Sequence, residues 1–376
     1  MKITDVEVIE LRTPGWTGET FDGSYDNCLV LVHTDAGITG IAEVDSVPSV
    51  IKAIINAPRS HSHAYGLKDA VLGQDPLNPP AVWDRMYDLT SYYGRRGVVI
   101  HAISAIDIAL WDIKGKAEKK PLSELLGTKK RDSLLAYGTV YPLGETPDAV
   151  RFNIDRGLKR GLKAIKIVAD PHWRYDLKKT ELLIRTARQH VGPEIRLMCD
   201  AATAWTEAEQ GLPVVPIFRD NGFLWLEAPL PIDDLAGHAR FAGQGVPIGG
   251  GDLGLTTHFE YETAFDVGKI DIAQPDVTMA GGLTELMRIA ASAKQRGKRV
   301  VTHGYKSNIT IAANLAFLSQ HWDDEPCEYS TSESELRWEL TNERFPLGPD
   351  GRIKVPTAPG LGVSLNTKTV AKYRVG

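Results

Sequence analysis

The sequence contains little of what marks several large classes of protein. It has 3 cysteines among 376 residues, at the widely separated positions Cys28, Cys199 and Cys327. No CxxC pair suggests a zinc site, and a scattered odd set argues against a disulfide framework. No apolar run approaches the roughly 18 residues that a membrane-spanning helix needs. These absences exclude a disulfide scaffold and predict that the chain has no membrane partner.

An excess of positive charge is also missing. Lysine and arginine number 43 against 48 aspartates and glutamates, so the formal net charge is −5, and no basic stripe stands out. Nucleic acid is therefore not an expected partner. The first ten residues alternate charged and apolar side chains, which predicts a strand and not a secretory signal peptide. We expect a cytoplasmic protein that acts on a small molecule.

The length and local patterns predict two structural units. At about 150 residues per domain, this chain makes roughly two domains or one large barrel with an appendage. Residues 1–125 read as an α+β unit with strands at 2–11 and 27–33 and an amphipathic helix at 100–116. Residues 13–26 combine glycines, a proline and aromatics without any period, which indicates a mobile loop.

From residue 131 to residue 335, short β-rich runs alternate with helical patterns. This alternation is typical of βαβ units and a parallel sheet, and eight such units favour a (β/α)₈ barrel. An open doubly wound sheet is the alternative, although no GxGxxG follows the first strand. Residues 336–376 are rich in turns, and we expect them to return to the first domain. The predicted strands are 133–140, 164–168, 196–199, 224–226, 246–249, 270–274, 299–302 and one near residue 328.

Ionisable residues recur at the ends of the predicted barrel strands. Six of them follow one another at intervals of 24 to 27 residues: Asp200, Glu227, Asp252, Asp276, His303 and Glu328. About that length makes one strand, one helix and two loops of a barrel. Because the carboxyl ends of barrel strands form one ring around the active-site mouth, the pattern predicts one shared site.

Three of these acids suit a metal ion. Asp200, Glu227 and Asp252 offer only oxygen, the ligand type that Mg²⁺ or Mn²⁺ prefers over zinc. Converging carboxylates also repel each other, so they need a cation or raised pKa values. The alternative is that each acid caps the helix that follows it.

Two further positions suggest acid–base chemistry. Asp276 and His303 come from adjacent units, and a carboxylate beside an imidazole makes a general base that works near neutral pH. The alternative for His303 is a histidine with a purely structural place in the core. Lys166 shares one strand face with apolar neighbours, which predicts that it points into a polar barrel mouth. There it could neutralise a substrate carboxylate.

Residues outside this ring are candidates for the distal part of a substrate. The loop aromatics Trp16, Phe21 and Tyr25 could select the substrate or simply pack the loop. Arg95, beside Tyr92 and Arg96, could bind a distal hydroxyl or a second carboxylate. Tyr137 and Trp205 could also face the pocket.

These motifs together resemble the enolase superfamily, in its mandelate racemase-like and muconate cycloisomerase-like branches. The resemblance covers nearly the whole chain. It implies a modified (β/α)₇β barrel under an N-terminal α+β capping domain that the C-terminal tail completes, and a homo-oligomer. It also implies Mg²⁺-assisted removal of the proton α to a carboxylate. The matching segments are Asp107–Lys116, the strands that end at Asp200, Glu227 and Asp252, Gln274–Val277 with Gly281–Gly282, and Pro359–Val363.

The resemblance also implies a role for each site residue. Asp200, Glu227 and Asp252 are similar to the metal ligands, and His303 with Asp276 to the catalytic dyad. Glu328 is similar to the acid that hydrogen-bonds the substrate carboxylate, and Lys166 to the first lysine of a Lys-x-Lys motif.

The second lysine of that motif is replaced by Val168. Two-base racemisation would lose one partner, whereas His303 alone could remove the α-proton and then protonate a departing β-hydroxyl. This change favours dehydration of an aldonate or aldarate to a 2-keto-3-deoxy acid.

Other activities fit the same residues. A cycloisomerase or epimerase of a sugar acid or lactone would share the metal and the first step. A catalytically silent sugar-acid-binding protein would keep the fold without the chemistry. A metal-free barrel that hydrolyses glycosides with paired carboxylates is a further alternative.

Overall fold

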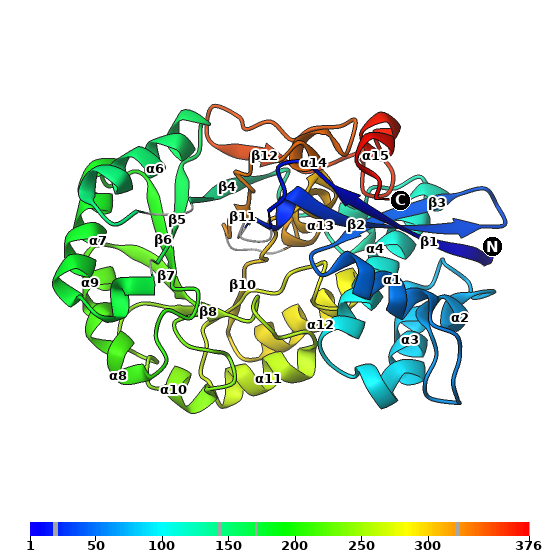
Figure 1. Ribbon diagram of the computed structural model, residues 1–376, viewed down its shortest axis with the longest axis horizontal. Helices are drawn as coiled ribbons and strands as arrows, with labels where there is room; N and C mark the ends of the chain where they lie inside the picture. The colour runs from blue at the N-terminus through cyan, green and yellow to red at the C-terminus, as the bar shows by residue number, and fades with distance from the viewer. Residues whose placement is uncertain (18–21, 141–143, 170, 321–323, 376) are drawn as a thin grey trace.

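The computed structural model describes residues 1–17, 22–140, 144–169, 171–320 and 324–375. Two parts lie side by side in Figure 1: a capping part formed by the first ~125 residues, and a curled sheet surrounded by helices. Phe21 lies outside the described residues, as does part of the loop expected at 13–26.

The capping part is built on an antiparallel sheet of three strands in the order β1-β2-β3. The strands are β1 (Ile3–Arg12), β2 (Asp26–Thr34) and β3 (Thr39–Val44). The predicted strands at 2–11 and 27–33 are therefore confirmed to within a residue. The helices of this part are α1 (Pro48–Asn56), α2 (Leu67–Val71), α3 (Pro79–Gly94), α4 (Val98–Glu118) and α5 (Leu122–Leu125), with a short 3₁₀ helix, η1 (Gly23–Tyr25).

Helix α4 confirms the helix predicted at 100–116 and lies where the cap meets the barrel. It is buried on nearly every face, because it packs against the cap sheet on one side and against barrel helix α12 on another. Strand β3 approaches it closely at Gly40, where a Cβ atom would lie 2.0 Å from the carbonyl oxygen of Ala109. A glycine is required at this position because any side chain would push the strand off the helix.

The second part contains the eight predicted parallel strands. Their order in the sheet is β10-β9-β8-β7-β6-β5-β4-β11, so seven consecutive strands follow the order of the chain. A doubly wound sheet reverses its strand order part-way, so that alternative is wrong. The strands are β4 (Ser133–Val140), β5 (Ala164–Val168), β6 (Arg196–Asp200), β7 (Phe223–Glu227), β8 (Ile248–Gly250), β9 (Ile272–Ala273), β10 (Arg299–Val300) and β11 (Cys327–Glu328).

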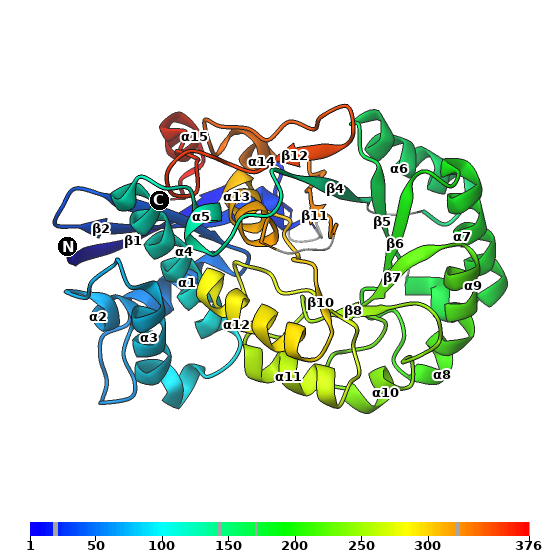
Figure 2. The ribbon, with the colours of Figure 1, turned by 180° about the vertical axis from the view of Figure 1, so that it is seen from behind.

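Helices cover the outside of this curled sheet, as Figures 1 and 2 show from opposite sides. Its interior is packed with the side chains of a small cluster that includes Tyr137, Met198 and Trp225. The inner space is therefore filled below the strand ends. The helices are α6 (Pro147–Lys159), α7 (Leu177–Val191), α8 (Ala208–Gly211), α9 (Val215–Asp220), α10 (Leu235–Ala239), α11 (His258–Asp266), α12 (Gly282–Gln295) and α13 (Asn308–Leu318), with 3₁₀ turns η2 (Pro171–Arg174) and η3 (Leu212–Val214).

The C-terminal tail contacts both parts. It contains α14 (Glu335–Glu339), β12 (Arg352–Lys354) and α15 (Thr367–Tyr373). Strand β12 pairs antiparallel with β4 of the barrel, whereas Arg374 just beyond α15 bridges to Leu11 of the cap. The division into residues 1–125, 131–335 and 336–376 stays a prediction.

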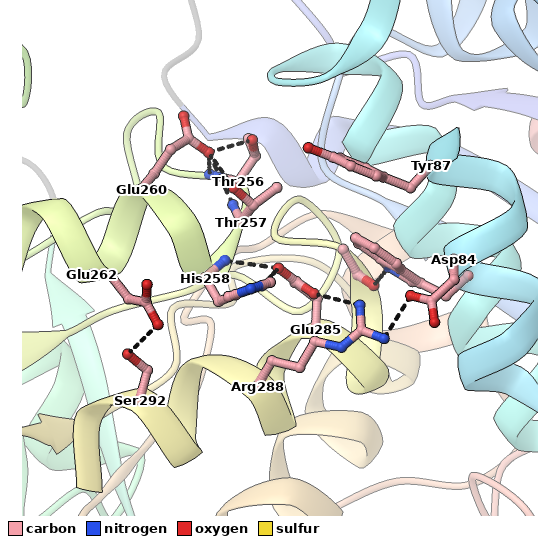
Figure 3. Close-up of polar contacts among 12 residues, drawn as sticks. Asp84, Tyr87, Thr256, Thr257, His258, Glu260, Glu262, Glu285, Arg288 and Ser292 are labelled. Carbon is pink, nitrogen blue, oxygen red and sulfur yellow. Dashed lines mark hydrogen bonds and ion pairs between the residues drawn. The ribbon is translucent and has the colours of Figure 1, made fainter. Parts of the chain in front are cut away.

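A polar network also joins the cap to the barrel on the side of α11 and α12 (Figure 3). The buried carboxylate of Glu285 accepts from the backbone and ring of His258, at 2.7 and 2.6 Å. Arg288 donates to Glu285 at 3.2 Å and to Asp84 of cap helix α3 at 2.7 Å. These contacts hold α3, α11 and α12 together.

Cys28, Cys199 and Cys327 are all free and buried. Within the described residues, no helix combines the length and apolar character needed to cross a bilayer.

Candidate functional site

A cavity of about 420 Å³ lies at the carboxyl ends of the barrel strands. Cap residues Asp22, Gly23, Tyr25 and Asp45 form part of its wall, so the cavity is shared by the two parts of the chain. The barrel contributes the charged residues Arg156, Arg160, Lys166, Asp200, Asp252, His303, Glu328 and Glu333, together with Thr139, Val140, Asn153, Gly157, Val168, Leu253, Met279, Tyr305, Thr331 and Ser332.

The predicted ring of ionisable residues lies at this end of the barrel. Asp200 and Glu227 are the last residues of β6 and β7 and occupy one rung of the sheet. Asp252 follows the end of β8 by two residues, and Glu328 ends β11. Helix capping does not explain these acids, because other residues hold the N-cap positions of the helices that follow: Glu207, Asp234 and Thr257.

Lys166 lies among the carboxylates and is 1% exposed. Its Nζ is 2.6 Å from Oε1 of Glu227, 3.3 Å from Oε1 of Glu328 and 3.9 Å from Oδ2 of Asp200. Burial alone would disfavour the ammonium, but Glu227 and Glu328 outweigh it and raise the pKa of Lys166 well above its ordinary value. The surrounding carboxylates therefore favour the charged form of Lys166.

The three expected metal ligands carry more negative charge than their neighbours neutralise. Burial, followed by the charge of Glu227, raises the pKa of Asp200 to about 8 and that of Asp252 to about 6. Oδ1 of Asp252 is buried and has no hydrogen-bond partner among the described residues. A group of oxygen donors with raised pKa values and an unpaired buried oxygen fits a hard divalent cation.

The three side chains do not form a closed metal cage in this structure. Within the described residues, no group of three histidine, cysteine, aspartate or glutamate side chains is gathered closely enough to hold an ion. Glu227 is engaged by protein donors instead: Oε1 accepts from Lys166, and Oε2 accepts from Trp225 at 3.1 Å and from Gln274. A cation at this place would therefore compete with Lys166 for Glu227.

His303 and Asp276 form the expected dyad. His303 Nδ1 lies 2.7 Å from Oδ2 of Asp276, and Oδ1 of Asp276 accepts from the backbone N–H and hydroxyl of Thr278 at 2.6 and 2.7 Å. A carboxylate only accepts, so Nδ1 carries the shared proton and Nε2 is the nitrogen that can exchange one. Burial opposes the charged ring, but Glu328 and Asp276 outweigh it and raise the pKa of His303 well above its ordinary value.

Glu328 lies between Lys166 and His303. Its Oε1 accepts from Thr139 Oγ1 at 2.5 Å, and its Oε2 accepts from the backbone N–H of Gly304 at 2.9 Å. Burial opposes ionisation, but Lys166 and His303 outweigh it and lower the pKa of Glu328 to about 2. In the substrate-free site Glu328 is an ionised acceptor, whereas the resemblance implies an acid that hydrogen-bonds the substrate carboxylate.

Val168 and Lys163, on either side of Lys166, lie where the alternation of strand β5 places them. Val168 ends β5, pairs with Asp200 across the sheet and lines the cavity with an apolar surface. Lys163 is exposed just before the strand begins.

Of the residues suggested for distal binding, Tyr25 lies in the cavity wall. Trp16 is 42% exposed and stacks against the guanidinium of Arg12 at 4.1 Å, outside the described lining. Arg95 is exposed on the surface of the cap, also away from this lining.

Tyr137 and Trp205 lie in the core and not in the cavity wall. Strand β4 continues three residues beyond Tyr137 to Val140, so its ring is buried one layer down, with Lys166 Nζ 5.5 Å from the ring centroid. Trp205 is fully buried, and Gly211 beside it leaves room for its ring.

The sequence reasoning missed several residues of the wall. Asp45 follows cap strand β3 and faces the barrel, and the only local signal for it is an acid after a strand. Arg156 lies in the last turn of α6 and Arg160 directly follows that helix, where a charged pair reads as an ordinary solvent-facing surface. Tyr305 and Met279 carry no signal that distinguishes them from core residues.

A curled parallel sheet with a ring of acids at its strand ends, closed by an α+β cap, defines a class of barrel enzymes whose site is shared between two parts. Residues 150–369 match the family model described as Enolase C-terminal domain-like. Residues 7–127 match the model of the mandelate racemase / muconate lactonizing enzyme N-terminal domain. The chain therefore belongs to the enolase superfamily and is an enzyme of its mandelate racemase and muconate lactonizing enzyme branch.

Several relatives resemble the chain over most of its length. The D-galactarolactone cycloisomerase of Agrobacterium fabrum is 33% identical over 319 residues, which cover 81% of this chain and 82% of that protein. The arabinonate dehydratase of Saccharolobus solfataricus is 31% identical over 332 residues, which cover 83% and 86%. The crystal structure of the 3,6-anhydro-D-galactonate cycloisomerase of Zobellia galactanivorans matches all of both chains with a TM-score of 0.87 and 28% identity.

Proposed function

We propose that this enzyme is a Mg²⁺-dependent dehydratase that converts an aldonate or aldarate to a 2-keto-3-deoxy acid. The observation that carries the proposal is the His303–Asp276 dyad in a cavity where Val168 replaces the second lysine. An apolar side chain at that position offers no second base, which disfavours racemisation and leaves chemistry that one histidine can complete. A relative named as an arabinonate dehydratase supports the same reaction class.

Asp200, Glu227 and Asp252 are the residues that would hold the metal ion, Mg²⁺ or alternatively Mn²⁺. When bound, such an ion stabilises the negative charge that develops on the substrate carboxylate as the α-proton leaves. The raised pKa values of Asp200 and Asp252 and the unpaired oxygen of Asp252 support this assignment.

Side chains of the enzyme then transfer the α-proton of the substrate. Neutral His303 removes the proton α to the carboxylate through Nε2, and Asp276 stabilises the imidazolium that forms. Lys166 supplies fixed positive charge beside the carboxylate as it becomes an enediolate. The imidazolium returns its proton to the β-hydroxyl, the C–O bond breaks, and water leaves. The resulting enol becomes the 2-keto acid.

Cycloisomerisation is the second candidate, because two of the similar proteins are named as cycloisomerases. It shares the proton abstraction by His303, but its product keeps the mass of the substrate. An epimerase would also conserve mass, and a silent binding protein would exchange no α-proton.

The decisive experiment is a screen of aldonates, aldarates and their lactones with Mg²⁺, read by a 2-keto-acid assay and by mass spectrometry. Loss of one water is the expected result. A product of unchanged mass would replace dehydration by isomerisation, and absence of both turnover and α-proton exchange in D₂O would favour a binding protein. Full activity in EDTA would contradict the metal and revive a metal-free mechanism.

A further inference from the structure

The loop that carries His303, residues 303–307, and the first turn of α13 that follows it are bonded to the cap along much of their length. Ser24 Oγ donates to the carbonyl of Tyr305 at 2.6 Å. Glu43, a fully buried carboxylate of cap strand β3, accepts from the backbone N–H and hydroxyl of Thr310 at 2.9 and 2.6 Å. The segment next to the proposed base is thus part of the contact between cap and barrel.

Lys306 is the charged residue of this loop, and its side chain is 3% exposed. Its Nζ donates to the carbonyl of Gly23 at 2.5 Å and to the carbonyl of Asp26 at 3.0 Å, and it pairs with Oδ1 of Asp45 at 3.2 Å. Burial opposes the charge, but Asp45 and Asp26 outweigh it and raise the pKa of Lys306. All three partners of this buried cation belong to the cap, and two of them, Gly23 and Asp45, line the cavity.

A chain of hydrogen bonds leads from the same contact to the dyad. The backbone N–H of Asp45 donates to Thr278 Oγ1 at 3.0 Å. Thr278 donates to Asp276, which orients His303. Lys306 lies three residues after His303. The contacts therefore connect these two residues of one loop through Asp45, Thr278 and Asp276.

We propose that Lys306 is a positioning residue that pins the Gly23–Tyr25 turn and Asp45 as a fixed wall of the cavity and thereby holds the His303 loop in place. Its effect on turnover rests on the proposed function, whereas its effect on the turn does not. Lys306 is buried and Asp45 is 24% exposed, so removing the lysine leaves a partly buried carboxylate without its partner.

The ion pair between cap and barrel in Figure 3 does not supply the same restraint. The ion pair between Arg288 and Asp84 is partly exposed on both sides, and water and salt screen such pairs. It also joins helices that lie away from the described lining of the cavity.

The test begins with hydrogen–deuterium exchange of the substrate-free protein. In Lys306→Met, we expect exchange in the peptide that covers residues 22–26 to rise about tenfold or more, because local opening costs less once the cation is gone. Peptides from β6 and β7 should exchange at the wild-type rate. Lys116→Met is the matched control, since Lys116 also donates to a backbone carbonyl and to a buried aspartate, Thr39 and Asp112, both within the cap.

Steady-state kinetics with the substrate found in the screen form the second part. We expect Lys306→Met to raise KM and lower kcat, Lys306→Arg to recover part of the loss, and Lys116→Met to leave both near wild type. Ser24→Ala, which removes one neutral bond from the same turn, should give a smaller change in the same direction. Thermal unfolding of each variant separates these effects from a general loss of folding.

Unchanged exchange at residues 22–26 in a folded Lys306→Met protein would overturn the proposal whatever reaction the enzyme performs. An equal rise in exchange over the whole chain in both lysine variants would overturn it as well. If exchange rises at residues 22–26 but no sugar acid is turned over, the pinning role stands and the proposed reaction fails.

Discussion

At the scale of single residues, the site places two basic side chains within a few ångströms of several carboxylates. Lys166 is shared by Glu227 and Glu328, and His303 is shared by Asp276 and Glu328. Lys166 is buried and His303 is 19% exposed, so a positive charge on either side chain depends on the carboxylates around it. Changing one member therefore alters the behaviour of the others.

Lys166→Met removes the cation that competes for Glu227. We expect kcat to fall by about 10²–10³-fold, because preorganised positive charge beside the developing enediolate is lost. The same variant should bind Mg²⁺ more tightly than wild type, since Lys166 no longer neutralises the ligands. Calorimetric titration with Mg²⁺ measures the second effect, and weaker Mg²⁺ binding in a folded variant would contradict the placement of the metal.

Asp276→Asn tests the orientation of the base. A general base acts when deprotonated, and the pKa of His303 is raised above its ordinary value, so the acidic limb of kcat/KM should lie above about pH 6.5. Replacing Asp276 removes both a hydrogen bond and a charge that favour the imidazolium. The limb should move to lower pH while the maximum falls about 10²–10⁴-fold. A pH–rate profile measures both, and a limb at the wild-type pH would rule out this role of Asp276.

At the scale of elements, the contact between α4 and α12 includes a buried acid. Asp107 of α4 accepts from the backbone N–H and hydroxyl of Thr284, at the start of α12, at 2.9 and 2.6 Å. Burial is the main cause that raises the pKa of Asp107 to about 7. The packing of the cap helix on the barrel therefore depends on pH.

The direction of this pH dependence follows from which state, folded or unfolded, binds the proton of Asp107 more strongly. With a folded pKa of about 7 against 3.8 when unfolded, the native state binds the proton more strongly, so this stabilisation is complete below pH 3.8 and lost as pH rises through 7. Between about pH 5.5 and pH 8.5, wild type should lose about 2 kcal/mol of unfolding free energy that Asp107→Asn retains. Urea unfolding at both pH values measures it. The exposed Glu118→Gln on the same helix should track wild type, and an identical pH dependence in Asp107→Asn would contradict the assignment.

At the scale of the whole molecule, the cavity exists only where the cap meets the strand ends. A metal ion bound there would add stability to the folded state alone. At a hundredfold excess of Mg²⁺ over its Kd, the gain is about 2.7 kcal/mol. We expect EDTA to abolish activity and lower the Tm, Mg²⁺ to restore both, and Glu227→Gln to show little change in Tm with either. Differential scanning calorimetry measures the shift, and a wild-type Tm indifferent to Mg²⁺ would count against the metal site.

Much of the fold could be predicted because its signals are local. Two strands of the cap, helix α4 and the eight barrel strands each follow from a short period of apolar residues, and all are present in the structure. The predicted bounds of the short strands β8, β9 and β10 are the least accurate. Each of these strands spans only two or three residues, and the rest of the predicted run is loop.

The sequence by itself determined the order of the barrel strands and the acids at or near their ends, because strand alternation and the length of a βα unit act over some 25 residues. Only the tertiary structure decided which side chains share the cavity. Asp45 and Tyr25 line the cavity from the cap, and Tyr137 is buried below it. Lys306 bonds the barrel to the cap at the cavity wall. These outcomes depend on contacts between residues up to 283 positions apart, as between Lys306 and Gly23. No local period records such contacts, because burial and charge pairing arise only once the chain has folded.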